Sequence, residues 1–266
     1  MTAAPPPAGG RTPLSAVIIA FNEEERLPGA LRSVAFCDEI VLVDAGSTDR
    51  TRELAQAAGA RVVVNAPWPG FLAQRRLATE AARHDWVLAV DADERVSEGL
   101  RAEIEGLRER GLTGPGYVLP RVSHYLGRWI RATDWYPDPQ LRLFDRRRAR
   151  WEGSLVHESV RPDGAPGRLR HELEHFSYRD VDEHLRRIES YAQLWARQAF
   201  AEGQRAGPAA AFGAGAWAFF RNYVLRRGFV LGGAGLAIST LNAHYAFTKL
   251  LLLHELSGGA EGSRRR

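Results

Sequence analysis

The chain has 266 residues, of which 45% are apolar, so it can bury a substantial core in one large domain or a domain with an appendage. Its net charge of +4 and pI of about 9.6 favour phosphate-rich partners such as nucleotides or anionic membrane. A single cysteine, Cys37, excludes an internal disulfide framework and fits a reducing compartment.

The first hundred residues alternate strand and helix patterns. Continuous apolar runs, which predict buried strands, lie at 14–20, 39–45, 61–65 and 86–90. Helical spacing is found at 23–34, 51–59 and 71–83, between these strands. Strands joined through helices require crossover connections, so the sequence predicts an α/β fold with a mainly parallel sheet.

The pattern changes after residue 114. Short strand-like pieces at 117–120, 140–144, 155–160 and 171–176 predict an irregular or antiparallel extension of the sheet. Residues 179–257 return to helical patterns, with breaks near Gly207–Pro208 and Gly228. We therefore expect a disordered leader (1–12) without a secretory signal, a catalytic domain (13–178), a helical extension (179–257) and a disordered basic tail (258–266).

Polar turns follow three of the predicted parallel strands and should lie on one edge of the sheet. They begin at Phe21-Asn22-Glu23, at Asp44-Ala45-Gly46-Ser47 and at Asp91-Ala92-Asp93. Open α/β sheets bind ligands at this edge, and carboxylates there suit Mg²⁺ or Mn²⁺ carrying a phosphorylated substrate. Taken singly, each turn could be only a helix cap or a solvated first helical turn, so their convergence is the stronger evidence.

The three motifs VIIAFNEEERLPGALRSV, EIVLVDAGSTDRT and DWVLAVDADE resemble, in order and spacing, the nucleotide-binding half of family 2 glycosyltransferases. The resemblance covers residues 14–160. It implies the GT-A fold, a Rossmann-like mainly parallel sheet, here followed by the C-terminal helical extension. It also implies a nucleotide-diphosphate sugar donor, a divalent metal (Mg²⁺ or Mn²⁺) and inversion at the anomeric carbon.

The same resemblance implies roles for individual residues. Asp93 is the expected metal ligand, with Asp91 shared between the metal and the ribose. Many family members carry two acids where this chain has Asp44-Ala45. Arg75 matches a position close to the nucleotide, although it could be only a solvated helix arginine. The expected nucleotide-sugar contacts are Phe21, Asn22, Glu23, Asp44, Gly46, Ser47, Arg75 and Asp91.

Two acids compete for the role of catalytic base, which an inverting transfer needs to take the acceptor proton. Asp138 lies in Asp138-Pro-Gln140-Leu-Arg142, which resembles the family's acceptor-side acid and its Q-x-R element. Glu158 is the rival, and its neighbour His157 could be a further metal ligand, or the two could form a structural pair. Trp135, Tyr136, Gln140 and Arg142 are expected acceptor or sugar contacts. Trp129 and Trp151 could also stack on sugars, although aromatic side chains more often fill cores.

Residues 228–248 carry no Asp, Glu, Lys or Arg, but their glycine and polar content makes a membrane span improbable. Aromatic residues and arginines around this stretch favour a helical hairpin on an anionic membrane surface. The alternative is a soluble helical cap on the catalytic domain. We expect a cytoplasmic protein, peripheral on the inner face of the cytoplasmic membrane.

The sequence therefore predicts a glycosyltransferase that moves a hexose from a nucleotide sugar to a lipid-linked or lipopolysaccharide-core acceptor. The WYPDPQLRLF and VHE segments, with the helical tail, resemble lipopolysaccharide inner-core glucosyltransferases of bacteria. The alternative is an inactive sugar-nucleotide-binding or membrane scaffold protein. A sugar nucleotidyltransferase would need a Gly-rich basic loop where Phe21-Asn22-Glu23 stands. Nucleic acid is not an expected partner, because the arginines are scattered and the presumed cleft is acidic.

Overall fold

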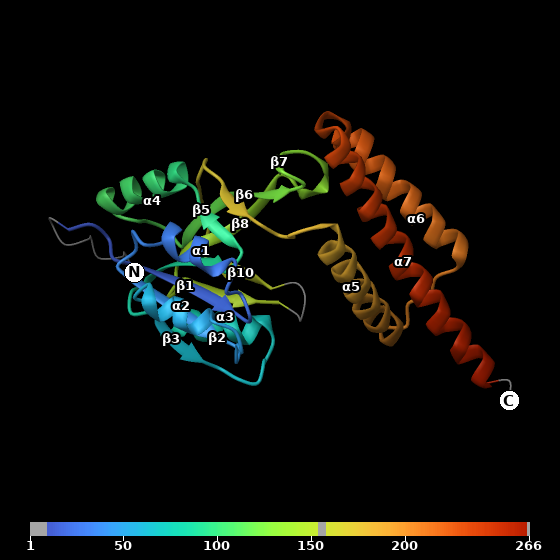
Figure 1. Cartoon of the computed structure of the whole chain (residues 1–266), viewed down its shortest axis with the longest axis horizontal. Coiled ribbons are helices and arrows are strands. Elements are labelled where there is room, and N and C mark those ends of the chain that lie inside the picture. The colour runs from blue at the N-terminus through green and yellow to red at the C-terminus, as the bar shows by residue number, and fades with distance from the viewer. Residues whose placement is uncertain (1–9, 154–157, 265–266) are drawn as a thin grey trace. The chain divides into compact units, whose positions relative to one another are not determined.

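The computed structural model describes residues 10–153 and 158–264, with side chains described as far as 258. The chain forms two compact units (Figure 1). The first unit combines the residues up to Arg121 with Asp138–His175, and the second combines Val122–Pro137 with the residues from Phe176 onward. This division places residues 122–137 with the helical part, whereas the sequence suggested a catalytic domain that runs unbroken to 178.

The first unit is built on the four predicted parallel strands, which lie in the order β3-β2-β1-β4. Strands β1 and β4 are almost wholly buried, which explains their continuous apolar sequences. The strands are β1 (Leu14–Ala20), β2 (Glu39–Asp44), β3 (Arg61–Val64) and β4 (Trp86–Asp91). The helices that connect or follow them are α1 (Leu27–Ser33), α2 (Thr51–Ala57), α3 (Phe71–Ala81) and α4 (Glu98–Arg110).

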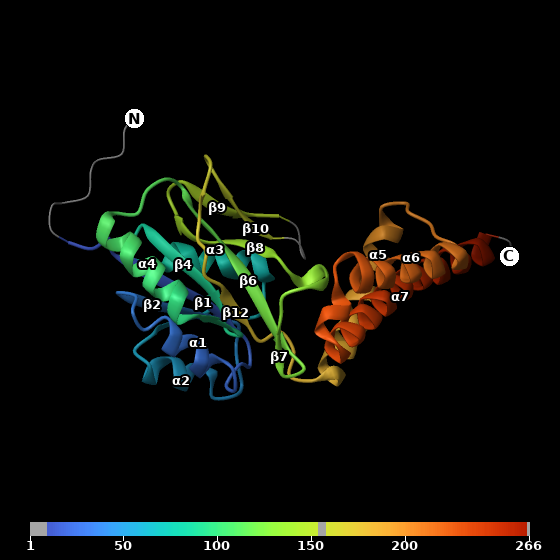
Figure 2. The same ribbon diagram turned by 90° about the horizontal axis from the view of Figure 1, so that it is seen from above.

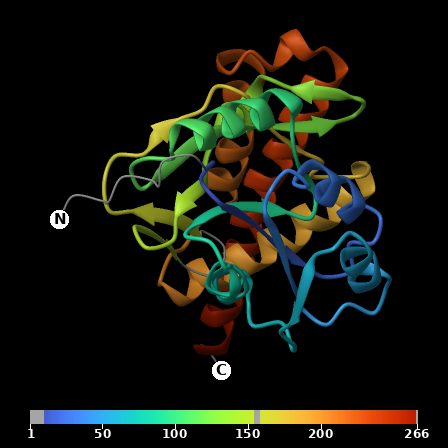
Figure 3. The same ribbon diagram turned by 90° about the vertical axis from the view of Figure 1, so that its left-hand side faces the viewer.

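Alternate residues of each strand serve two separate cores, one on each face of the sheet. Ile18 and Leu88 pack with residues of α1 and α4 on one face. Val17 and Val87 pack with Ala78 of α3 on the other face. Figure 3 shows α4 and α3 on opposite sides of the strands. The first unit is therefore a three-layer α/β/α sandwich, and the α/β fold that the strand and helix alternation predicted is confirmed.

Antiparallel strands extend the sheet beyond β4 in the order β8-β6-β12-β5 (Figure 2). The predicted antiparallel extension is thus confirmed for the pieces near 117–120, 140–144 and 171–176, and it continues the sheet itself, whereas the piece predicted at 155–160 lies partly outside the described residues. Its strands are β5 (Glu94–Val96), β6 (Gly116–Tyr125), β8 (Asp138–Asp145) and β12 (Leu173–His175), with the two-residue β11 (Gly167–Arg168) beside β6. A separate hairpin is formed by β9 (Ala149–Glu152) and β10 (Ser159–Pro162).

The second unit contains three long helices, α5 (Val181–Ala201), α6 (Pro208–Phe220) and α7 (Gly233–Arg264). A π-helical turn, η2 (Arg221–Leu225), and a 3₁₀ turn, η3 (Gly228–Leu231), connect α6 to α7. The predicted breaks at Gly207–Pro208 and Gly228 are both found. Helix α7 continues as far as Arg264, through most of the range expected to be a flexible tail. Within the described residues, none of the helices combines the length and the apolar character needed to cross a bilayer.

The remaining elements of the second unit are β7 (Arg128–Ile130), which pairs with the end of β6, and the 3₁₀ turn η1 (Thr133–Trp135). Tyr125, Ile130, Leu231 and Ile238 form a core between this hairpin and the helices. The second unit thus has its own hydrophobic centre.

Candidate active site

The three polar turns meet at one edge of the first unit, as the sequence predicted. In the parallel ladder Ala20 pairs with Asp44, and Ile19 pairs with Asp91. The carboxyl ends of β1, β2 and β4 are therefore level with one another. In an open α/β sheet this edge is where ligands bind.

The turns after β1 and β2 are joined directly by hydrogen bonds. Asn22 donates its backbone N–H to Ser47 Oγ at 2.9 Å, and its side-chain Oδ1 accepts from the N–H of Thr48 at 2.9 Å. Glu23 donates its N–H to Thr51 Oγ1 at 2.8 Å. Asn22 has a φ of 55°, a left-handed conformation that asparagine tolerates better than most residues. These bonds hold the two turns together as one polar surface. The neighbouring Phe21 ring is half exposed.

Asp44 is fully buried and organises the second turn. Its Oδ1 accepts from the N–H of Gly46 at 3.0 Å and of Ser47 at 2.9 Å, and its Oδ2 accepts from the Ser47 hydroxyl. Gly46 adopts a φ of 93°, which favours glycine at this position. The Asp44 carboxylate thus shapes the turn, and a ribose or base contact would have to share its oxygens with these bonds.

Asp91, at the end of β4, is held between two arginines. Arg75 of α3 forms a double contact with it, through Nη2 to Oδ2 at 2.9 Å and Nη1 to Oδ1 at 2.8 Å. Arg142 of β8 adds a bond from Nη2 to Oδ2 at 2.8 Å. Burial alone would raise the pKa of Asp91, but the charges of Arg142 and Arg75 outweigh burial and hold this pKa well below its usual range. Asp91 is therefore ionised and paired across the physiological pH range.

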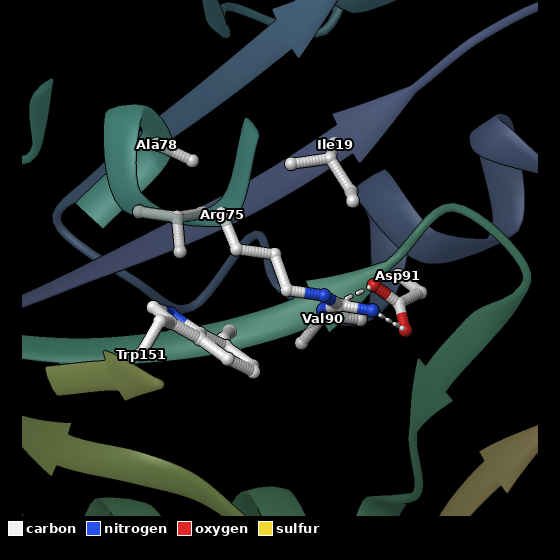
Figure 4. A pocket seen from close by; sticks show the side chains of 8 residues that line it. Ile19, Arg75, Ala78, Val90, Asp91 and Trp151 are labelled. Atoms are coloured by element: carbon white, nitrogen blue, oxygen red, sulfur yellow. Dashed lines mark hydrogen bonds and ion pairs between the residues drawn. The ribbon is translucent and has the colours of Figure 1, made fainter. Parts of the chain in front are cut away.

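A small pocket lies beside this ion pair (Figure 4). Trp151 of β9 forms one wall, and the Arg75 guanidinium lies 4.8 Å from the centre of its ring. Trp151 itself is 4% exposed and donates its indole N–H to Thr79 Oγ1 at 3.1 Å. Trp151 is thus a buried support for Arg75, which differs from the sugar-stacking role considered from the sequence.

Glu94 and Arg121 join the site although the sequence did not single them out. Glu94 is fully buried; its Oε1 accepts from Arg121 Nη1 at 2.8 Å and from Arg142 Nη2 at 3.0 Å. Its Oε2 accepts the backbone N–H of Asp91 at 2.9 Å. Burial lowers the pKa of Arg121, but Glu94 and Asp138 outweigh this effect and raise that pKa above its usual value. The only hint in the sequence was the position of Glu94 directly after Asp93.

Asp138, the expected base, begins β8 and lies at the other end of this network. Arg121 contacts its Oδ2 through Nε at 2.8 Å and Nη2 at 2.6 Å. Gln140 donates its side-chain amide to Oδ1 at 2.6 Å. The side chain of Asp138 is 31% exposed, so solvent or an acceptor can reach it. Alternating charges thus run without interruption from Arg75 through Asp91, Arg142, Glu94 and Arg121 to Asp138.

Asp93 follows Asp91 on the same turn but has a different partner. His175 of β12 lies 3.4 Å away, from Nε2 to Asp93 Oδ2. Within the described ranges, no group of three or more His, Cys, Asp or Glu side chains is arranged to hold a metal ion. Mg²⁺ is commonly held by one or two carboxylates together with phosphate oxygens and water, and the Asp91-Ala92-Asp93 turn offers donors of that kind.

The rival base, Glu158, also reaches this region: its Oε1 lies 3.5 Å from Arg75 Nε. Its neighbour His157, the other expected metal ligand, falls outside the described residues. Glu158 and Asp138 therefore contact opposite ends of the charged network, and the geometry leaves both as candidates.

Trp135 and Tyr136 belong to the second unit. Trp135 packs in an aromatic cluster, with ring centres 5.4 Å from Tyr125 and 5.8 Å from Tyr178. The adjoining Asp134 is anchored by the buried Asn222, which accepts its backbone N–H at 2.9 Å and donates to its Oδ2 at 2.9 Å. Trp135 thus contributes to a core, and no pattern in the sequence indicated that Asn222 would anchor the adjoining Asp134.

The α/β sandwich and the acidic edge of its parallel strands define a transferase of the GT-A fold class. The chain belongs to glycosyl transferase family 2, whose family model matches residues 15–161.

Similar proteins are also glycosyltransferases, in agreement with this family membership. The chain is 34% identical over 201 residues to the lipopolysaccharide core biosynthesis glycosyltransferase LpsC of Rhizobium meliloti, which covers 73% of this chain and 74% of that protein. It is 29% identical over 265 residues to an uncharacterized glycosyltransferase of Rickettsia bellii, covering 92% and 87%. Among solved structures, Staphylococcus aureus TarS is similar with 21% identity and a TM-score of 0.39 over 45% of this chain and 38% of that one. That structural similarity is too low for comparison of individual residues.

Proposed function

We propose that this glycosyltransferase moves a hexose from a nucleotide-diphosphate sugar to a lipid-linked or lipopolysaccharide-core acceptor, with inversion at the anomeric carbon. The observation that carries the proposal is the meeting of the Asn22, Asp44 and Asp91 turns at one sheet edge beside the buried Arg142 and the partly buried Arg75. LpsC is named as an enzyme of lipopolysaccharide core biosynthesis, which supports this acceptor class. The reaction would take place at the inner face of the cytoplasmic membrane.

Arg142 and Arg75 are the groups best suited to the donor diphosphate. Within the described part of the chain, Arg142 Nε and Nη1 are buried and have no hydrogen-bond partner. A buried donor without an acceptor costs about 1–3 kcal/mol. Phosphate oxygens would satisfy such donors and offset the positive charge that the arginines bring. We infer that the two arginines stabilise the negative charge that grows on the leaving diphosphate.

Asp93, with Asp91, is the proposed holder of the divalent metal. When bound, the metal would neutralise charge on the diphosphate and so assist its departure. Asp91 already balances two arginines, whereas among the described residues the ion-pair partner of Asp93 is His175, at 3.4 Å. Asp93 is therefore the residue whose loss should affect metal binding most directly.

Asp138 is the proposed base. Its carboxylate would accept the proton of the acceptor hydroxyl as that oxygen attacks the anomeric carbon. Arg121 and Gln140 fix the orientation of both carboxylate oxygens, which is a requirement for a positioned base. Glu158 remains the alternative, since its carboxylate lies beside Arg75 at the other end of the charged network.

Donor binding and turnover of the purified chain test the proposal. Calorimetry with common nucleotide sugars and Mn²⁺ should reveal one bound donor, and slow donor hydrolysis or transfer should follow. Asp93→Asn should remove the Mn²⁺-dependent part of both signals with an unchanged circular dichroism spectrum. Asp163→Asn, at an exposed ion pair with Arg148, is the matched control and should behave as the wild type.

Two outcomes would count against the proposal. If no nucleotide sugar binds, the donor assignment is wrong. If donors bind but no acceptor supports turnover, the protein is a sugar-nucleotide-binding or scaffold protein.

The comparison of Asp138→Asn with Glu158→Gln assigns the base, because the variant of the true base should lose kcat by at least about 100-fold with donor affinity preserved.

A further inference from the structure

Helix α6 buries its small residues and exposes its large ones, which is the reverse of a helix in a soluble core. Its buried positions are Ala211, Gly215 and Ala218. Its exposed positions include Phe212, Trp217 and Phe220, which are 72%, 55% and 45% exposed. The next turn adds Val224 and Leu225, which are 44% and 55% exposed. We call Phe212, Trp217, Phe220, Val224 and Leu225 the apolar face.

The packing of α6 against α7 explains why this face stays outside. A side chain at Gly215 would meet Phe247 Cβ at 3.1 Å and the carbonyl oxygen of Ala243 at 3.3 Å. The small residues therefore let the two helices lie close together, as they do side by side in Figure 1. Rotating α6 to bury its aromatic rings would drive them into this seam. The apolar face is thus held outward by the packing of the small residues.

The charge around the apolar face is mainly positive. Residues 203–254 contain no aspartate or glutamate, but they contain Arg205, Arg221, Arg226, Arg227 and Lys249. Arg221, Arg226 and Arg227 directly follow α6, and all three are exposed. Asp134 pairs with Arg221 and lies 3.6 Å from Arg226, so it offsets only part of this charge. Large apolar side chains bordered by arginines are suited to a surface that is apolar inside and anionic outside.

We propose that the apolar face of α6 and η2 docks on an anionic lipid bilayer, with Arg226 and Arg227 at the headgroups and the aromatic rings inserted beneath them. Helix α6 has 13 residues and is about 20 Å long, shorter than the roughly 30 Å apolar layer of a bilayer, so it lies in the interface. This inference deepens the proposed function by naming the surface that brings the enzyme to a membrane-embedded acceptor. Docking itself requires neither donor nor acceptor.

Sedimentation with vesicles tests the docking without nucleotide sugar. The full chain should bind vesicles that contain phosphatidylglycerol at least tenfold more tightly than pure phosphatidylcholine vesicles, and added salt should weaken binding. The variant Phe212→Ser/Trp217→Ser/Phe220→Ser should lose at least tenfold in partitioning. The matched control is Leu185→Ser/Tyr191→Ser/Leu194→Ser on α5, whose side chains are 41%, 44% and 43% exposed, and its binding should match the wild type.

A second measurement places the contact on α6. Lipids brominated in their acyl chains should quench part of the tryptophan fluorescence of the bound wild type. Trp217→Phe should keep vesicle binding but lose most of that quenching.

Three results would overturn the proposal: no binding of the wild type to anionic vesicles, equal binding of the α6 triple variant, or a concentration-dependent dimer that this variant abolishes. The last result would make the face a contact between two copies. Donor calorimetry on the same samples separates these failures from a failure of the proposed function, because it reports only on the first unit.

Discussion

Replacing Glu94 by glutamine tests whether this buried carboxylate is the centre of the charged network. The carboxylate accepts from Arg121, Arg142 and the N–H of Asp91. A glutamine has one oxygen and one NH₂ group, so either the arginines or the Asp91 N–H must face a donor. One unsatisfied buried contact costs about 1–3 kcal/mol. The two ion pairs with Arg121 and Arg142 would become hydrogen bonds with one charged partner, which loses roughly 1 kcal/mol each.

We therefore expect Glu94→Gln to lower the free energy of unfolding of the first unit by about 3–5 kcal/mol. Urea unfolding at pH 7.5, followed by circular dichroism, measures this change. The matched control is Glu105→Gln, which removes an exposed pair with Arg101 and should change the free energy of unfolding by no more than about 0.5 kcal/mol. A Glu94→Gln value within 0.5 kcal/mol of the wild type at an equal m-value would refute this reasoning.

Three further predictions concern the dependence of stability on pH and the stability of the Ser47 turn. Because the folded pKa of Asp91 is depressed, its stabilising contribution is present above the unfolded value of about 4 and is lost as pH falls below it. The stability difference between wild type and Asp91→Asn should therefore shrink from pH 6 to pH 3 in urea titrations, and a constant difference would contradict the ion pairing.

Burial, with the charge of Arg187, lowers the pKa of His184 to about 4, so its contribution is present above about pH 6.5 and is lost as pH falls toward 4. The second unit should lose about 2 kcal/mol between pH 7.5 and pH 5, a loss that His184→Gln should lack. Ser47→Ala should lower stability by about 1–2 kcal/mol in thermal unfolding, and Ser33→Ala, whose hydroxyl bonds only within α1, should cost less.

The parallel half of the fold was readable from the sequence because its local signals agree. A strand buried on both faces must be apolar throughout, and the run at 14–20 satisfies this condition at every position but Ser15. The convergence of the turns then follows from parallel pairing alone. The positions of the three long helices followed from their breaks at Pro208 and Gly228.

The rest depends on pairings between distant residues, which a single sequence does not reveal. Strand β8 inserts between β4 and β6, and this placement brings Arg142 to Asp91, 51 residues away. Arg121 meets Glu94 across 27 residues, and nothing in its local sequence distinguishes it from the other arginines. Asn222 supports Asp134 across 88 residues. Strand order and helix packing determine which of these residues pair, and the local sequence pattern does not.

The hydrogen bonds between the Asn22 and Ser47 turns have a consequence for the affinity with which a small molecule binds there. The Ser47 hydroxyl accepts from the Asn22 N–H and donates to Asp44 within its own turn, so the two turns cannot move apart without breaking the bond to Asn22. A ligand that binds to preorganised turns does not have to order them, so the entropic cost that otherwise weakens association is smaller. These two turns should therefore keep their shape between turnovers, so any motion that accompanies binding must involve other segments.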